Sequence, residues 1–246
     1  MTATTDPMPT PDVGGPKASD TDERHDRING SRVWRFDRVE RWLHWTVAVL
    51  VLVLIATGSI LYIGALSTWV GRRVLVKDVH VWSGLLLPVP WLLALPGTRG
   101  RALRRDLGRL SRWYRDDTTW VRTRGRSSSA AGLRKFNAGQ KLFTLLVGGA
   151  LPVLLGTGLI LRWYEPFPLS IRNGATFVHD WTYLVLTIVV VGHILKALAE
   201  PEALRSMRTG WVSAAWARTH RLRWWLESGG TDPRPTAEQP RQDPPR

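Results

Sequence analysis

The sequence predicts an all-α integral membrane protein, a four-transmembrane-helix bundle with both termini in the cytoplasm. Three observations predict this fold class. The chain contains four long apolar runs, the segments between them differ sharply in Lys and Arg content, and histidines recur near the ends of the runs. The formal net charge of +14 and the hydrophobic content of 44% are averages over these alternating blocks, so they describe none of the blocks well.

Three segments make up the expected organisation. Residues 1–30 are rich in Pro, Thr, Asp and Gly and contain no apolar stretch, which favours a disordered tail over a signal peptide. Residues 31–200 form the membrane domain, with a cytoplasmic loop over residues 98–141. Residues 201–246 form a cytoplasmic segment that ends in a Pro-rich tail. We expect no folded soluble domain, because no outer segment is long and apolar enough, and no internal repeat is visible.

Each apolar run is long enough to cross a bilayer, whose hydrocarbon core takes about 20 apolar residues in a helix. Three runs carry no charged residue, over residues 45–63, 79–98 and 142–161. The fourth extends from Trp181 to Leu195, and further outward if Asp180 lies at the interface. A soluble bundle would show polar stripes at helical spacing, and these runs do not. Pro88 and Pro90 must kink the second run.

The distribution of Lys and Arg indicates the topology. Residues 98–141 carry thirteen, and the two outer flanks, residues 1–41 and 196–246, carry seven and nine. The two remaining connections together carry only five. Because Lys and Arg concentrate in cytoplasmic loops, both termini and the 98–141 loop are expected in the cytoplasm of a multi-pass protein of the cell membrane. The charge of +14 then reflects topology and contact with lipid, and nucleic acid is not an expected partner.

Four histidines lie near the ends of the runs at two depths. His44 and His193 lie at the cytoplasmic ends of the first and fourth runs, and His80 and His179 lie at the outer ends of the second and fourth. The fourteen residues from His179 to His193 span about 21 Å of helix and leave both within about 40° of one face. We therefore expect two level-matched pairs that face each other across the bundle.

Paired imidazoles inside a bilayer point to ligation. A polar side chain there is costly and is by default a functional candidate, although for any single histidine an ordinary hydrogen-bonded role is the simpler interpretation. Zinc prefers three or four ligands with carboxylate or thiolate help, and neither level supplies them. Bis-histidine ligation of haem iron needs one imidazole on each side of a flat ring. The chain has no Cys for covalent attachment, so two non-covalent b haems are expected in the bundle.

A flat macrocycle also needs small residues beside it. Glycines occur in the runs at Gly58, Gly84, Gly148, Gly149, Gly156, Gly158 and Gly192. Each is equally compatible with ordinary close packing of helices, so no single glycine decides between the two interpretations.

Four pieces of sequence carry a family resemblance. They are LHWTV around His44, VHVWSG around His80, KFNAGQK at residues 135–141, and VHDW…GHILKA around His179 and His193. With these, the chain resembles the dihaem cytochrome b (gamma) subunit of respiratory formate dehydrogenases over about residues 31–225. The related cytochrome b subunits of nickel–iron hydrogenases and thiosulfate reductases share the architecture. The long Arg-rich tails and the two prolines of the second run depart from the family.

The resemblance implies that His44 and His193 ligate an inner haem and that His80 and His179 ligate an outer haem, which is the pairing that the topology predicts. It also implies an iron–sulfur subunit that feeds the outer haem, a molybdenum or tungsten catalytic subunit beyond it, and a site for menaquinone or ubiquinone beside the inner haem. The expected quinone contacts are Asn137, Gly139, Gln140 and His193. The alternative for Asn137 is a helix cap at the start of the third run.

The predicted function is electron transfer from a dehydrogenase, with formate dehydrogenase as the leading candidate, to a quinone. Substrate oxidation would occur on another subunit, and quinone reduction on this one. The alternatives are a cytochrome b subunit of a hydrogenase or thiosulfate-reductase-type complex, a non-haem membrane anchor, and a transporter that uses the histidines as a proton or metal path. Transporters usually show internal repeats or intramembrane carboxylates, and no acidic residue lies in these runs.

Overall fold

The computed structural model describes residues 28–29, 31–123, 125 and 134–230, which are mostly helical. The tail expected over residues 1–30 lies outside the described residues apart from Ile28 and Asn29. The Pro-rich end of the chain, from residue 231 onward, also lies outside them.

Three helices in the described part of the chain are long and apolar enough to cross a membrane: α2 (Arg38–Tyr62), α8 (Ala138–Arg162) and α9 (Leu169–Leu198). They contain the first, third and fourth predicted runs. Within each, only 6% of the most apolar stretch is buried inside the chain. Apolar helix surfaces of this extent are not stable in water and indicate contact with a membrane. The chain is a membrane protein.

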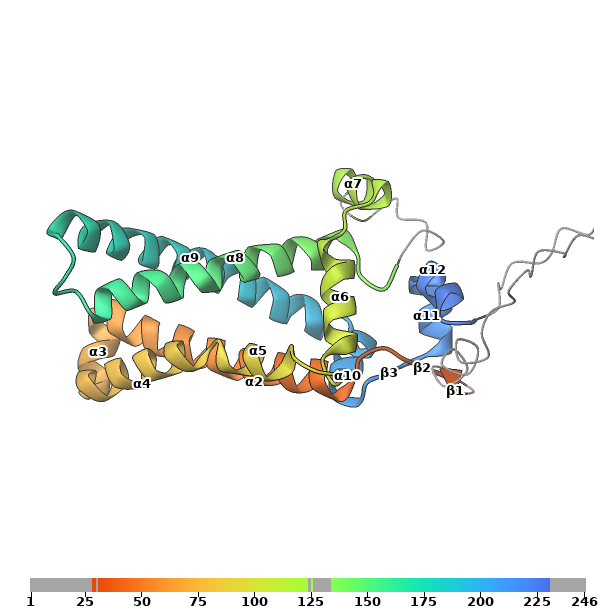
Figure 1. Cartoon of the computed structure of the whole chain (residues 1–246), viewed down its shortest axis with the longest axis horizontal. Helices are drawn as coiled ribbons and strands as arrows, with labels where there is room; N and C mark the ends of the chain where they lie inside the picture. Colours follow the sequence, from red (N-terminus) through yellow and green to blue (C-terminus); the bar gives the residue numbers. More distant parts are fainter. Residues whose placement is uncertain (1–27, 30, 124, 126–133, 231–246) are drawn as a thin grey trace, which may run out of the picture.

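The second predicted run forms two shorter helices, α4 (Arg73–Leu86) and α5 (Val89–Ala94). The break falls where the sequence predicts a kink. Pro88 and Pro90 have no N–H to donate, so the helical hydrogen-bond ladder is interrupted there. The two pieces nevertheless run end to end beside α2 (Figure 1), and the short α3 (Gly64–Val70) connects α2 to α4.

The long helices are arranged as two pairs. α2 packs along α4 and α5, and α8 packs along α9. Figure 1 shows these pairs as two layers, which meet where α4 contacts α8. As a result, a side chain of α2 or α4 that faces α9 lies at the boundary between the two pairs.

A unit of short elements lies at one end of the bundle (Figure 1). Its helices are α6 (Arg101–Ser111), α7 (Arg115–Arg122), α10 (Pro201–Thr209), α11 (Ala214–His220) and α12 (Leu222–Glu227). Three antiparallel strands, β1 (Ile28–Asn29), β2 (Arg32–Trp34) and β3 (Trp211–Ser213), pair in the order β1-β2-β3. Val33 lies opposite Val212, and both are fully buried in a core that includes Trp224 and Trp225. This small folded core was not expected, because β2 and β3 come from opposite ends of the chain and neither can fold alone.

Candidate functional site

His80 of α4 and His179 of α9 form the outer pair of imidazoles. Their ring centres lie 6.3 Å apart with the ring planes at 65°. Both residues lie deeper along their helices than the apolar runs suggested. His80 is about two turns past the start of α4, and His179 is about three turns past Leu169, the first residue of α9. The extra turns of α9 before His179 contain Arg172 and Asn173, which hydropathy alone would not assign to a membrane helix.

A threonine hydroxyl from the neighbouring helix contacts each outer histidine. Thr57 Oγ1 lies 2.9 Å from His80 Nδ1, and Thr157 Oγ1 lies 2.9 Å from His179 Nδ1. Each hydroxyl also lies 2.6–2.7 Å from the carbonyl oxygen four residues earlier in its own helix. A carbonyl oxygen only accepts, so the single hydroxyl hydrogen goes to it, and the threonine oxygen accepts from Nδ1–H. This tautomer leaves a lone pair on Nε2, the nitrogen that can bind a metal.

These threonines are functional candidates that the sequence analysis missed. A short repeat could have identified them: residues 57–61 read TGSIL and residues 157–161 read TGLIL. The glycine that follows each threonine lies beside the imidazole, at a distance where a Cβ would make ordinary van der Waals contact. A Cβ added at Gly58 would lie 3.5 Å from His80 Cε1, and one at Gly158 would lie 3.5 Å from His179 Cε1.

His44 of α2 and His193 of α9 form the inner pair, with ring centres 6.4 Å apart and ring planes at 57°. Aromatic contacts hold these rings. His193 stacks on Phe143 of α8 at 4.3 Å and 17°, and His44 meets Trp45 edge-on at 5.3 Å. Within the described part of the chain, His44 Nδ1 is buried without a hydrogen-bond partner. Among the described residues, His44 therefore has no counterpart of the two threonines.

Asn137, Gly139 and Gln140, the other predicted site residues, form the start of α8. Asn137 Oδ1 accepts from the backbone N–H of Gln140 at 2.9 Å, and Gln140 Oε1 accepts from that of Asn137 at 3.1 Å. This reciprocal capping box stabilises the beginning of the helix. A Cβ at Gly139 would lie 2.8 Å from the ring of Trp120, so glycine lets α7 pack against α8. The cap uses the two side-chain carbonyl oxygens and leaves the amide NH₂ groups to donate elsewhere.

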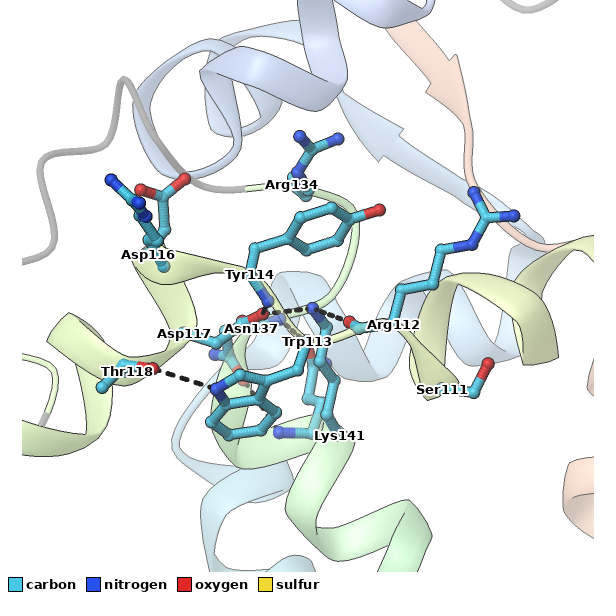
Figure 2. Close-up of polar contacts among 12 residues, drawn as sticks. Ser111, Arg112, Trp113, Tyr114, Asp116, Asp117, Thr118, Arg134, Asn137 and Lys141 are labelled. Carbon is cyan, nitrogen blue, oxygen red and sulfur yellow. Dashed lines mark hydrogen bonds and ion pairs between the residues drawn. The ribbon is translucent and has the colours of Figure 1, made fainter.

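Buried ion pairs hold this stretch against the short helices. Lys141 Nζ donates to Asp117 at 2.6 Å and to the carbonyl oxygen of Arg112 at 2.9 Å, an arrangement that Figure 2 shows at the start of α8. Lys135 pairs with Asp106 of α6. Burial lowers the pKa of Lys135, and the negative charge of Asp106 opposes that shift. Because a buried charge without its partner is costly, these pairs hold the stretch to α6 and α7.

A family model described as prokaryotic cytochrome b561 matches residues 35–210. The chain belongs to the prokaryotic cytochrome b561 family. The cytochrome is 24% identical to the formate dehydrogenase cytochrome b556 subunit of Haemophilus influenzae over 207 residues. These aligned residues cover 81% of this chain and 84% of the relative. Two formate dehydrogenase cytochrome b556 subunits of Escherichia coli K12 are also similar. The nitrate-inducible (Fdn) subunit is 25% identical over 201 residues, 77% of this chain and 88% of the relative. The fdo subunit is 23% identical over 208 residues, 78% and 92% of the two chains.

Membership of this family implies haem b, and the paired imidazoles fit that group. Two metal–imidazole bonds of about 2 Å on opposite sides of one metal ion place the ring centres roughly 6 Å apart. The two pairs of the cytochrome, at 6.3 Å and 6.4 Å, have this separation. No three His, Cys, Asp or Glu side chains gather as a metal cluster among the residues that the structure describes. With its apolar helices and its family, the chain is a membrane cytochrome b with an electron-transfer role.

Proposed function

We propose that this cytochrome is a dihaem subunit that carries electrons from the outer side of the membrane to a quinone on the cytoplasmic side. His80 and His179 would ligate an outer haem, and His44 and His193 an inner one. Bound haem b supplies reversible one-electron chemistry at its iron. The observation that carries this proposal is that α9 contributes one histidine to each of two imidazole pairs at different depths.

The proposed topology has four crossings, with α4 and α5 together as the second. They cover residues 73–94, about 33 Å at about 1.5 Å per residue, which matches the hydrocarbon core. The pairing of β2 with β3 supports an even number of crossings. β2 precedes the first membrane helix and β3 follows the last, so the chain must return to the side from which it entered.

The side with the paired strands would be the cytoplasm. Helices α6 and α7, which belong to the Arg-rich stretch of the sequence, lie at this same end (Figure 1), as the positive-inside rule expects. In this organisation, residues 31–200 contain the cytochrome domain in the cell membrane. Residues 201–230 would complete the small cytoplasmic unit with β2.

We propose a menaquinone or ubiquinone site at the cytoplasmic end, where the inner pair meets the start of α8. A quinone that receives electrons there can collect protons from the cytoplasm. The amide NH₂ groups of Asn137 and Gln140 can donate to a quinone carbonyl while their oxygens cap the helix. Gly139 lies between them with its open side against the Trp120 ring, and His193 stacks on Phe143, three residues after Gln140 in α8.

The partners are proposed from the names of the relatives, which are formate dehydrogenase subunits. The cytochrome would bind an iron–sulfur subunit that delivers electrons to the outer haem, with a molybdenum or tungsten catalytic subunit beyond it. A hydrogenase or thiosulfate-reductase-type complex is the second candidate, since the family model covers prokaryotic cytochrome b561 in general.

A pyridine haemochrome assay on the purified, fully loaded chain tests the proposal. We expect two non-covalent b haems per chain and two one-electron steps in a redox titration. No haem at all would contradict a cytochrome function and favour a membrane anchor or transporter. One haem would contradict the two-pair assignment.

A further inference from the structure

The two imidazole pairs differ in what their Nδ1 atoms contact. In the outer pair, both Nδ1–H groups donate to a threonine hydroxyl at 2.9 Å. In the inner pair, His44 Nδ1 is buried without a hydrogen-bond partner among the described residues, and His193 is held by stacking on Phe143. The two pairs have similar ring separations, but the outer histidines are hydrogen-bonded at Nδ1 and His44 is not.

The threonine contacts are built in the same way on two separate helices. On α2 and again on α8, the hydroxyl donates back to the carbonyl of Val53 or Val153, as threonines inside helices often do. This bond orients the hydroxyl so that its oxygen faces the neighbouring helix as an acceptor. The TGSIL and TGLIL repeat thus places the same acceptor beside each outer histidine.

A third contact joins two of the helices that form the outer site. Ser59, next to Gly58 in the repeat, hydrogen-bonds through Oγ to the Tyr183 hydroxyl at 2.7 Å, which ties α2 to α9 across the boundary between the helix pairs. The Tyr183 ring also covers Gly58, because a Cβ there would lie 3.3 Å from it. The acceptor at Thr57 is therefore held in place by its own helix and by α9.

We propose that Thr57 and Thr157 are positioning residues that set the reduction potential of the outer haem below that of the inner haem. This inference rests on the dihaem function proposed above. A histidine that donates its second N–H to an acceptor is a more basic ligand. A more basic ligand favours the oxidised, more positive iron, and hydrogen bonding around the ligands is one of the means by which a protein tunes haem. With haem bound, such a difference in potential would favour electron transfer from the outer pair to the inner pair.

Redox titration of the full-length, haem-loaded chain tests this role. Thr57→Val and Thr157→Val keep the shape of the side chain and remove the hydroxyl acceptor, whereas Thr57→Ser and Thr157→Ser keep the hydroxyl. Thr187→Val is the matched control, because Thr187 also donates to the carbonyl four residues earlier, at 2.8 Å, on α9. The outer haem is assigned beforehand from the step that His80→Ala removes.

We expect each valine variant to shift the midpoint potential of the outer haem to a more positive value and the double variant to shift it further. The inner haem should be unchanged, and the serine variants and Thr187→Val should titrate like the unaltered chain. If a valine variant does not retain its outer haem, Thr57→Cys provides the test, because a thiol is a weak acceptor of similar size. Its outer potential should also rise.

An outer potential that is unaltered in the valine or cysteine variants, or an inner potential that shifts equally, overturns this inference. Such a result in a preparation with two haems leaves the proposed function intact. An unaltered chain that binds no haem contradicts the proposed function instead, so the two failures are distinguishable.

Discussion

The imidazoles of His80 and His179 face each other across the boundary between the two helix pairs, with their ring centres 6.3 Å apart. The first comes from α4 and the second from α9, so the two rings meet only when both helix pairs are assembled. The same geometry recurs at the other depth between His44 and His193. Substitution of the four paired histidines is therefore the most direct test of the proposed function.

We predict that His80→Ala and His179→Ala abolish the same haem step, and that His44→Ala and His193→Ala abolish the other. When either imidazole of a pair is removed, the iron would have one ligand fewer or the haem would not be retained. Redox titration of the haem absorbance in membranes measures both steps. If His44→Ala and His179→Ala affected the same step, the pairing would be wrong.

Asn137 allows the quinone role and the helix-cap role to be separated. Asn137→Ala removes the cap at a cost of about 1 kcal/mol, whereas Ser is about as good a cap as Asn but has no amide NH₂ to donate. If the amide contacts the quinone, both variants should slow electron delivery to a quinone analogue while the two haem spectra remain intact. We expect this result, together with a lower thermal stability of the alanine variant alone.

The control for this experiment is Thr144→Val, about two turns beyond Asn137 along α8, whose hydroxyl donates to the Gln140 carbonyl of the same helix at 2.9 Å. Slower quinone reduction in Asn137→Ala but not in Asn137→Ser would show that the cap alone matters. In that case the quinone site lies elsewhere.

Gly139→Ala should destabilise the protein, because the new Cβ would lie 2.8 Å from the Trp120 ring. Overpacking of this kind typically lowers the free energy of unfolding by about 1–3 kcal/mol. Thermal unfolding in detergent measures the loss. Gly139→Ala combined with Trp120→Leu should recover part of it, and Gly108→Ala, where a Cβ meets nothing within 4 Å, should be neutral or stabilising. Equal melting temperatures for Gly139→Ala and Gly108→Ala would refute this packing.

Asp106→Asn should destabilise the unit of short elements at the end of the bundle, because it leaves the buried Lys135 ammonium without its main partner. Breaking a buried pair typically costs about 3–5 kcal/mol. We expect the lower end of that range, since the nearby Glu40 carboxylate also raises the pKa of Lys135. Asp106→Leu with Lys135→Met should recover stability. Arg223→Ala, at an exposed pair with Glu227, should change it by about 1 kcal/mol or less.

The same variant should show a characteristic pH dependence. Burial holds the pKa of Lys135 in the folded chain below its ordinary value of 10.5, and loss of Asp106 lowers it further. Between the folded and unfolded pKa values the unfolded chain binds more protons, so stability rises with pH. Asp106→Asn should therefore regain thermal stability as the pH is raised toward 10.5. A melting temperature that falls over this interval more steeply than that of the unaltered chain would refute the assignment.

The features of the candidate site that could be predicted from the sequence are those that a single helix defines, such as the position of a histidine along its helix and the face on which it lies. The depth of His44 or His193 follows from its distance to charged residues, and the shared face of His179 and His193 follows from the helical repeat. For Asn137 the sequence left a cap and a ligand role open, and the capping box in the structure shows that its carbonyl oxygen serves the cap. The start of α9 at Leu169 was missed, because hydropathy does not mark helical turns that carry polar residues.

The sequence by itself determined the three helices long and apolar enough to cross a membrane, and it predicted the side of the membrane that each segment favours and the two levels of the histidines. Those properties depend on bilayer thickness, charge and helical period, which act locally along the chain. Only the tertiary structure decided that Thr57 and Thr157 contact His80 and His179, that Phe143 stacks on His193, and that β2 pairs with β3. These contacts depend on how each helix is rotated against its neighbour and on which distant segments meet, and packing of the whole chain determines both.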